Sequence, residues 1–215
     1  MSANEPADKD ATLSALIALF GPQGVRDWND RAGLNGRERF LAVLERDLDL
    51  AIRELESDAQ HHQDRGEDLM TRMIVSFLRG RQYSVKSDPN ERGHTDILVE
   101  HQMLNLKWIG EAKIHTAYPV NAKGLRQLLF RYASGADDRG GLILYVFNEN
   151  ALAMMDHWQK YLMDPGLRMD TLRIEPDLHG TRFRFLSIHK HPVGIEFTIR
   201  HHFVLLHFAP RDRES

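Results

Sequence analysis

The sequence predicts an α/β protein, in which helices cover a mixed β-sheet, and three observations lead to this prediction. Apolar residues recur every three or four positions over residues 36–60, a pattern typical of an amphipathic helix. Residues 81–114 change to short strand-like segments. The run GGLILYVFN at residues 140–148 is almost continuously apolar, which is typical of a strand buried on both faces.

Composition limits the class of protein. The 215 residues suffice for one well-cored domain with appendages, and 42% hydrophobic and 27% charged residues are ordinary for a globular protein. The absence of cysteine excludes disulfides, cysteine-ligated metals and cysteine nucleophiles. A net charge of −3 argues against a protein that coats DNA passively. It does not exclude an enzyme, because a bound divalent cation supplies positive charge locally.

Membrane and nucleotide signatures are missing from the sequence. The N-terminus lacks a basic start followed by an apolar segment, and no apolar run reaches the length needed to cross a bilayer. We therefore expect a cytoplasmic protein with no membrane partner. There is also no glycine-rich phosphate loop, GxSxG elbow, HExxH motif or dinucleotide fingerprint.

The N-terminal elements are helical. A short apolar pattern over residues 12–20 ends at Gly21-Pro22, which predicts a helix stop, and the residues before it are expected to fray. A long helix follows over residues 36–60, and a third covers residues 66–80. Glu67 lies in the first turn of this third helix and Ile74 is two turns further on, so Glu67 points toward whatever the helix packs on.

The remaining elements alternate between strands and helices, and the predicted organisation has three parts. Residues 1–60 form a helical N-terminal extension, residues 61–165 a core, and residues 166–215 a β-hairpin-rich extension packed on the core. We expect strands at residues 81–87, 95–100, 105–114 and 140–148, helices at residues 121–134 and 150–163, a loop at residues 88–93, and antiparallel strands over residues 170–208 with a turn at residues 191–194.

Three charged residues stand inside these strand segments. Alternation places Glu111 and Lys113 on one face of their strand. A four-residue hairpin loop would pair His101 with Leu106, which sets Asp96 opposite Glu111, at a Cβ separation of roughly 5 Å. Two such carboxylates repel each other unless positive charge lies between them. Lys113 supplies one charge, and a cation that prefers hard oxygen ligands, Mg²⁺ or Mn²⁺, would supply the rest.

A carboxylate-held metal beside a lysine suits phosphodiester hydrolysis. The metal activates a water molecule and neutralises charge on the phosphate, while the lysine orients the water or stabilises the transition state.

Asp96 and the triplet Glu111-Ala112-Lys113, on two strands that follow a helix bearing Glu67, resemble the PD-(D/E)XK nuclease superfamily. The resemblance covers residues 62 to 150, whose order of elements, α-β-β-β-α-β, is that of the family core. It implies a restriction-endonuclease-like fold in which Asp96, Glu111 and the carbonyl of Ala112 bind the metal. Lys113 would be the catalytic lysine, and Glu67 would support metal binding directly or through water.

The resemblance extends to one further residue and departs from the family pattern twice. Gln127 occupies the place of a glutamine that many of these enzymes carry on the helix after the third strand. Thr95 stands where the family has a proline, and the spacing from Gln127 to Tyr132 is one residue longer than in the helicase-associated branch. His94 is a loop histidine that could also contact a phosphate.

Structural alternatives remain open for each of these residues. Asp96, Glu111 and Lys113 could be ordinary charges on a solvated sheet face, Glu67 a first-turn glutamate favoured by the helix dipole, and Gln127 a polar helix residue at the sheet edge.

The C-terminal hairpin has its own alternatives. It holds Arg182, Arg184, Lys190 and Arg200 against the single acid Glu196, so it could follow a nucleic-acid backbone or present a half-exposed sheet face. His189 and His191 have metal-ligand spacing, but the sequence offers no third ligand.

These observations predict a metal-dependent nuclease that hydrolyses DNA, and the resemblance implies prokaryotic defence, restriction or repair as its setting. Cutting both strands would require a second copy, and the helix at residues 36–57 could supply a homodimer interface or cover its own subunit. A nuclease of this kind could also act together with a protein partner or activator. The alternatives are a catalytically silent module for nucleic-acid or protein interaction, and a nuclease that acts on RNA.

Overall fold

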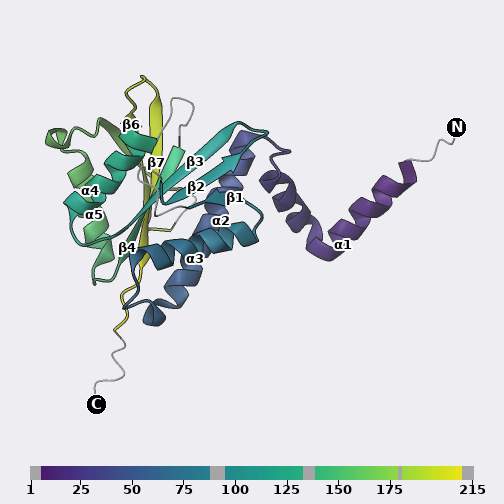
Figure 1. The fold of residues 1–215 in the computed structure, drawn as a ribbon, viewed down its shortest axis with the longest axis horizontal. Helices are drawn as coiled ribbons and strands as arrows, with labels where there is room; N and C mark the ends of the chain where they lie inside the picture. Colours follow the sequence, from purple (N-terminus) through teal and green to yellow (C-terminus); the bar gives the residue numbers. More distant parts are fainter. Residues whose placement is uncertain (1–5, 88–94, 133–138, 179–180, 210–215) are drawn as a thin grey trace, which may run out of the picture. The chain divides into compact units, whose positions relative to one another are not determined.

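The computed structural model describes residues 6–87, 95–132, 139–178 and 181–209, and within them the protein has the predicted α/β class (Figure 1). Its centre is a mixed seven-stranded sheet in the order β1-β2-β3-β4-β7-β6-β5. The chain forms two compact units, Met1–Asp47 and Leu48–Ser215, so the division falls inside the long helix that was predicted over residues 36–60. None of the helices in the described ranges has the length and apolarity that a bilayer span requires.

The first unit contains α1, Pro6–Arg31, and the start of α2, Arg37–Ser57. The predicted stop is present, because Gly21 has φ 68° and ψ 163° and breaks the helical path. The helix then resumes to Arg31, since a proline is tolerated in a first helical turn. The expected fraying of the first ten residues is too broad, since α1 begins at Pro6.

The second unit contains the sheet and the remaining helices. The helix expected at residues 121–134 begins earlier, at Tyr118, because Pro119 suits its first turn, and it continues as a π-helical turn, Leu128–Tyr132. The elements after α2 are α3 Glu67–Gly80, β1 Ser84–Lys86, β2 Ile97–His101, β3 Leu106–Ile114, α4 Tyr118–Gln127, β4 Arg139–Val146, α5 Ala151–Leu162, β5 Thr171–Pro176, β6 Arg184–Lys190 and β7 Glu196–Leu205, with short 3₁₀ turns at Ala59–His61 and Pro165–Leu167.

The pairing of strands confirms the predicted hairpin. In the antiparallel pair β2–β3, His101 lies opposite Leu106 and Ile97 opposite Gly110. β3, β4 and β7 are parallel neighbours, and β6 and β5 continue the sheet antiparallel. The C-terminal strands therefore extend the central sheet edge to edge, because β7 pairs with β4 along its whole length.

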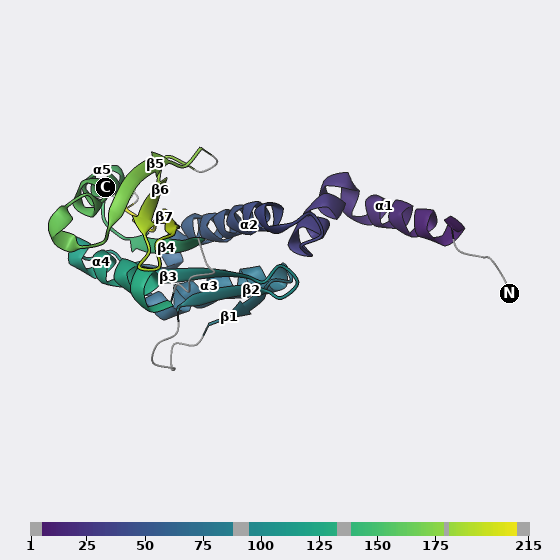
Figure 2. The same ribbon diagram turned by 90° about the horizontal axis from the view of Figure 1, so that it is seen from above.

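Helices cover both faces of this sheet (Figure 2). On one face, Leu125 of α4 and Trp158 of α5 belong to a core cluster with Leu142 and Leu144 of β4. On the other face, the hydroxyl of Tyr145, also on β4, lies 3.1 Å from Thr71 Oγ1 of α3. Alternate residues of β4 therefore face opposite helical layers, which explains its almost continuous apolar sequence.

The structure corrects both expectations for the C-terminal arginines. Arg184 and Arg200 are buried, and both bind the carboxylate of Asp49 on α2, at 2.9 Å and 3.0 Å. Arg200 also donates to Asp177 at 2.7 Å. These two cations are neutralised inside the protein, so they neither follow a nucleic-acid backbone nor lie on a half-exposed face.

The C-terminal histidines form a buried hydrogen-bonded chain. Trp158 Nε1 donates to His201 Nδ1 at 3.1 Å, so the proton of His201 is on Nε2, which lies 2.6 Å from Ser187 Oγ. His189 Nδ1 lies 3.0 Å from the carbonyl of Met169 and its Nε2 lies 2.7 Å from the same hydroxyl. Burial lowers the pKa of His189 to about 4. Both nitrogens of His189 are thus engaged, which argues for a structural role and not for metal ligation.

Candidate functional site

The candidate site lies where β3 continues past the beginning of β2. The β2 ladder starts at Ile97, opposite Gly110, so the last residues of β3 have no β2 partner. Two carboxylates accept hydrogen bonds from the backbone amides that β2 leaves unpaired. Ala112 N donates to Asp96 Oδ2 at 2.8 Å, and Ile114 N donates to Glu67 Oε2 at 2.8 Å. A backbone amide is an obligatory donor, so these bonds fix both carboxylates against β3.

Thr95 helps to hold Asp96 in this place. Its side chain is buried, and its hydroxyl donates to the carbonyl of Gly110 on β3. Thr95 therefore attaches the chain to β3 just before Asp96.

The ammonium of Lys113 joins the predicted site residues. Lys113 Nζ lies 2.8 Å from Glu111 Oε1, 3.1 Å from Glu67 Oε1 and 3.5 Å from Asp96 Oδ2. It also donates to the carbonyl oxygen of Ala112 at 2.7 Å. The prediction that Asp96 and Glu111 come close together with Lys113 between them is confirmed, and Glu67 is brought to the same point from α3.

The electrostatics of the cluster are unbalanced. Glu111 is 2% exposed, and its Oε2 has no hydrogen-bond partner among the described residues. Burial, and to a smaller extent the charge of Asp96, raise the pKa of Glu111 to about 7 against the opposing effect of Lys113. Burial alone would lower the pKa of Lys113, but Glu111 and Asp96 raise it above its ordinary value. One ammonium faces three carboxylates and cannot neutralise all of them. The charged form of Glu111, the most buried of the three, is therefore the most strongly disfavoured.

A glycine on α4, which the sequence did not single out, fits against this cluster. A Cβ at Gly124 would lie 3.1 Å from Lys113 Cγ and 3.3 Å from Glu111 Cγ, tighter than ordinary contacts. Its signal in the sequence is a glycine inside a helical pattern, which often marks close packing. Gln127 is half-buried at the end of α4, one turn later, and the contacts of Lys113 with the carboxylates do not include it.

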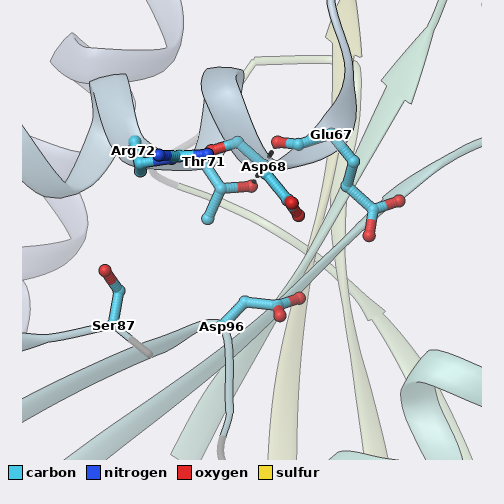
Figure 3. Close-up of a pocket in the computed structure, with 6 residues that line it drawn as sticks. All are labelled: Glu67, Asp68, Thr71, Arg72, Ser87 and Asp96. Carbon is cyan, nitrogen blue, oxygen red and sulfur yellow. Dashed lines mark hydrogen bonds between the residues drawn. The ribbon is translucent and has the colours of Figure 1, made fainter. Parts of the chain in front are cut away.

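Beside the cluster, a small hollow opens between α3 and the beginning of β2. Figure 3 shows the carboxylate of Asp96 pointing toward the first turn of α3, from which Glu67 and Asp68 point back. The hollow measures about 20 Å³, enough for one water molecule or ion. It is lined by Glu67, Asp68, Thr71, Arg72, Ser87 and Asp96, of which the sequence predicted only Glu67 and Asp96.

The donor atoms suit a hard cation. Asp96, Glu111 and the carbonyl of Ala112 offer only oxygen, which Mg²⁺ and Mn²⁺ prefer. Oε2 of Glu111 is a buried acceptor that has no hydrogen-bond partner among the described residues, so a cation would satisfy it. In the part of the chain that the structure describes, however, no three His, Asp or Glu residues are arranged to hold an ion. The oxygens converge on Lys113 Nζ instead. His94 and the side chain of Tyr132 lie outside the described residues.

Comparison of the chain with protein-family models, with curated proteins and with solved structures finds no match. The case for a function therefore rests on the geometry and chemistry of the site.

Proposed function

We propose that the protein is a metal-dependent nuclease of the PD-(D/E)XK type that hydrolyses DNA phosphodiester bonds. One observation carries the proposal: the partly buried ammonium of Lys113 lies within 3.5 Å of carboxylates from α3, from the residue preceding β2 and from β3, where β3 extends beyond β2. An acidic cluster with a lysine and only oxygen donors is suited to phosphoryl chemistry.

The chemistry of each site residue suggests a separate role in the reaction. Asp96, Glu111 and the carbonyl of Ala112 would hold Mg²⁺ or Mn²⁺, which when bound supplies an activated water and neutralises charge on the phosphate. Lys113 donates a hydrogen bond to the attacking water or to the phosphate as its charge grows. Glu67, anchored to the amide of Ile114, orients the ammonium of Lys113.

The proposal extends to the biological setting. Defence, restriction or repair in a prokaryote would use such an activity on DNA, and cleavage of both strands would require a second copy of the chain, because one such site cuts one strand. A protein activator could bring the site to its working state.

The test is a cleavage assay on supercoiled plasmid, linear duplex, single-stranded DNA and RNA, with Mg²⁺, with Mn²⁺ and with EDTA. Asp96→Asn and Lys113→Met should each lower DNA cleavage by a factor on the order of 10² or more. Glu100→Gln is the matched control, since Glu100 is a β2 carboxylate that pairs with Lys86 outside the cluster.

Three outcomes would contradict the proposal in different ways. Cleavage that survives both site substitutions would show that Asp96 and Lys113 do not form the active site. Cleavage of RNA alone would correct the substrate. A lack of cleavage on every substrate would favour a catalytically silent module.

A further inference from the structure

The ammonium of Lys113 occupies the point at which the proposed metal ligands meet. Its Nζ lies 2.8 Å from Glu111 Oε1 and 3.5 Å from Asp96 Oδ2, and it donates to the carbonyl of Ala112 at 2.7 Å. These are the same three ligand groups that the proposed function assigns to the divalent cation. An ammonium and a divalent cation cannot share them at such distances, because two positive charges that close repel each other.

We propose that Lys113 is the built-in counter-ion of the metal site, and that a divalent cation binds only when the ammonium leaves the oxygens of Asp96 and Glu111. This inference rests on the ligand set of the proposed function. It also explains why the three carboxylates of the site are not arranged around an ion position in the described part of the chain.

A second observation also points to a cation at this site. The Oε2 atom of Glu111 is buried in a side chain that is 2% exposed, and no described residue hydrogen-bonds to it. Lys113 satisfies only Oε1 of this carboxylate. A single ammonium is therefore an incomplete substitute for an ion of higher charge.

The structure also offers the ammonium another partner. Glu67 Oε1 lies 3.1 Å from Lys113 Nζ, and the Glu67 side chain is 30% exposed, compared with 2% for Glu111. The base of the lysine chain is held where Lys113 Cγ packs against Gly124, so movement is confined to the end of the side chain. Glu67 can thus keep the ammonium inside the site after it releases Glu111.

Removal of the ammonium should therefore tighten metal binding. We would measure Mn²⁺ affinity by electron paramagnetic resonance of the free ion, in the absence of nucleic acid, for the wild-type protein, Lys113→Met and Lys113→Arg. The Met variant should bind Mn²⁺ at least about tenfold more tightly, and the Arg variant should remain near the wild type because it keeps the charge. Equal or weaker binding by the Met variant would overturn the inference.

Glu67→Gln provides a second variant that does not depend on the folding of Lys113→Met. With Lys113 present, loss of the Glu67 charge should weaken Mn²⁺ binding several-fold, because the ammonium loses its alternative partner. In the Lys113→Met background the same substitution should weaken binding less, because only the direct attraction between the Glu67 charge and the cation is then lost. Equal weakening in both backgrounds would make Glu67 a metal ligand and overturn its role as the partner of the displaced lysine.

The binding assay separates this inference from the proposed function. Tighter Mn²⁺ binding by the Met variant without any cleavage activity would support the counter-ion and reject the nuclease. Metal-dependent cleavage by the wild type, together with unchanged Mn²⁺ affinity in the Met variant, would reject the counter-ion alone. Failure of both proteins to bind Mn²⁺ would reject both.

Discussion

Substitution of Glu111 by glutamine should stabilise the protein relative to the wild type, and this gain should be larger at neutral pH than at acid pH. Gln keeps the shape of the side chain but cannot ionise. Glu111 is 2% exposed, and its Oε2 lacks a partner in the described structure. The charged carboxylate is therefore unfavourable in the folded state, and the resulting loss of stability grows as the pH rises from the pKa of an unfolded glutamate toward the pKa of Glu111 in the fold.

The raised pKa gives both the size and the sign of the effect. Below pH 4.5 the carboxyl group is protonated in the folded and unfolded chains alike. As the pH rises toward 7, the unfolded chain loses this proton and the folded chain keeps it, so the free energy of unfolding falls. The shift of the pKa from 4.5 to about 7 corresponds to a loss of about 3 kcal/mol, and the side chain is too buried for solvent to screen it.

Urea denaturation in EDTA, followed by the fluorescence of the buried Trp108 and Trp158, measures this loss at pH values from 4.5 to 8. The difference in unfolding free energy between Glu111→Gln and wild type should grow in favour of the variant by about 3 kcal/mol across this range. Glu100→Gln is the control, because Lys86 lowers the pKa of Glu100 and the trend should not appear. Parallel curves for Glu111→Gln and wild type would refute the reasoning.

Three further substitutions test other parts of the structure. Ser187→Ala should cost about 1–3 kcal/mol, because it leaves a buried nitrogen of His189 without a partner; an unchanged urea midpoint would contradict the hydrogen-bonded chain. Asp49→Asn should cost about 3–5 kcal/mol by removing the carboxylate that the buried Arg184 contacts, and a loss below about 1 kcal/mol would argue against it. Gly124→Ala should change stability by no more than about 1 kcal/mol and weaken Mn²⁺ binding, so unchanged affinity would show that its packing has no effect on the site.

The local part of the site was predictable from sequence. A four-residue loop and strand alternation fix the pairing of His101 with Leu106, and the same register brings Asp96 to Glu111 and Lys113. The helical phase of Glu67 also turned it toward the strands. These relationships depend on short stretches of chain, in which the period of the backbone determines the direction of each side chain.

The long-range part was not predictable, because it depends on pairs far apart in the sequence. Asp49 lies 151 positions before the arginine that it neutralises, so the C-terminal cations appeared available for nucleic acid. The parallel pairing of β7 with β4 was missed for the same reason: strand pattern gives no information on which distant strand is the neighbour. The close fit of Gly124 against Lys113 likewise depends on how α4 lies on the sheet.

The interpretation of the three charges as a solvated sheet face conflicts with the energetics of the cluster. A solvated carboxylate gains little from a lysine and loses little without it. Glu111 is instead almost fully buried, shares one ammonium with Glu67 and Asp96, and has one oxygen to which no described residue hydrogen-bonds. A core that served stability alone would be better off with apolar residues at these positions. The arrangement is understandable if the excess negative charge is needed for a cation that Lys113 replaces until the metal binds.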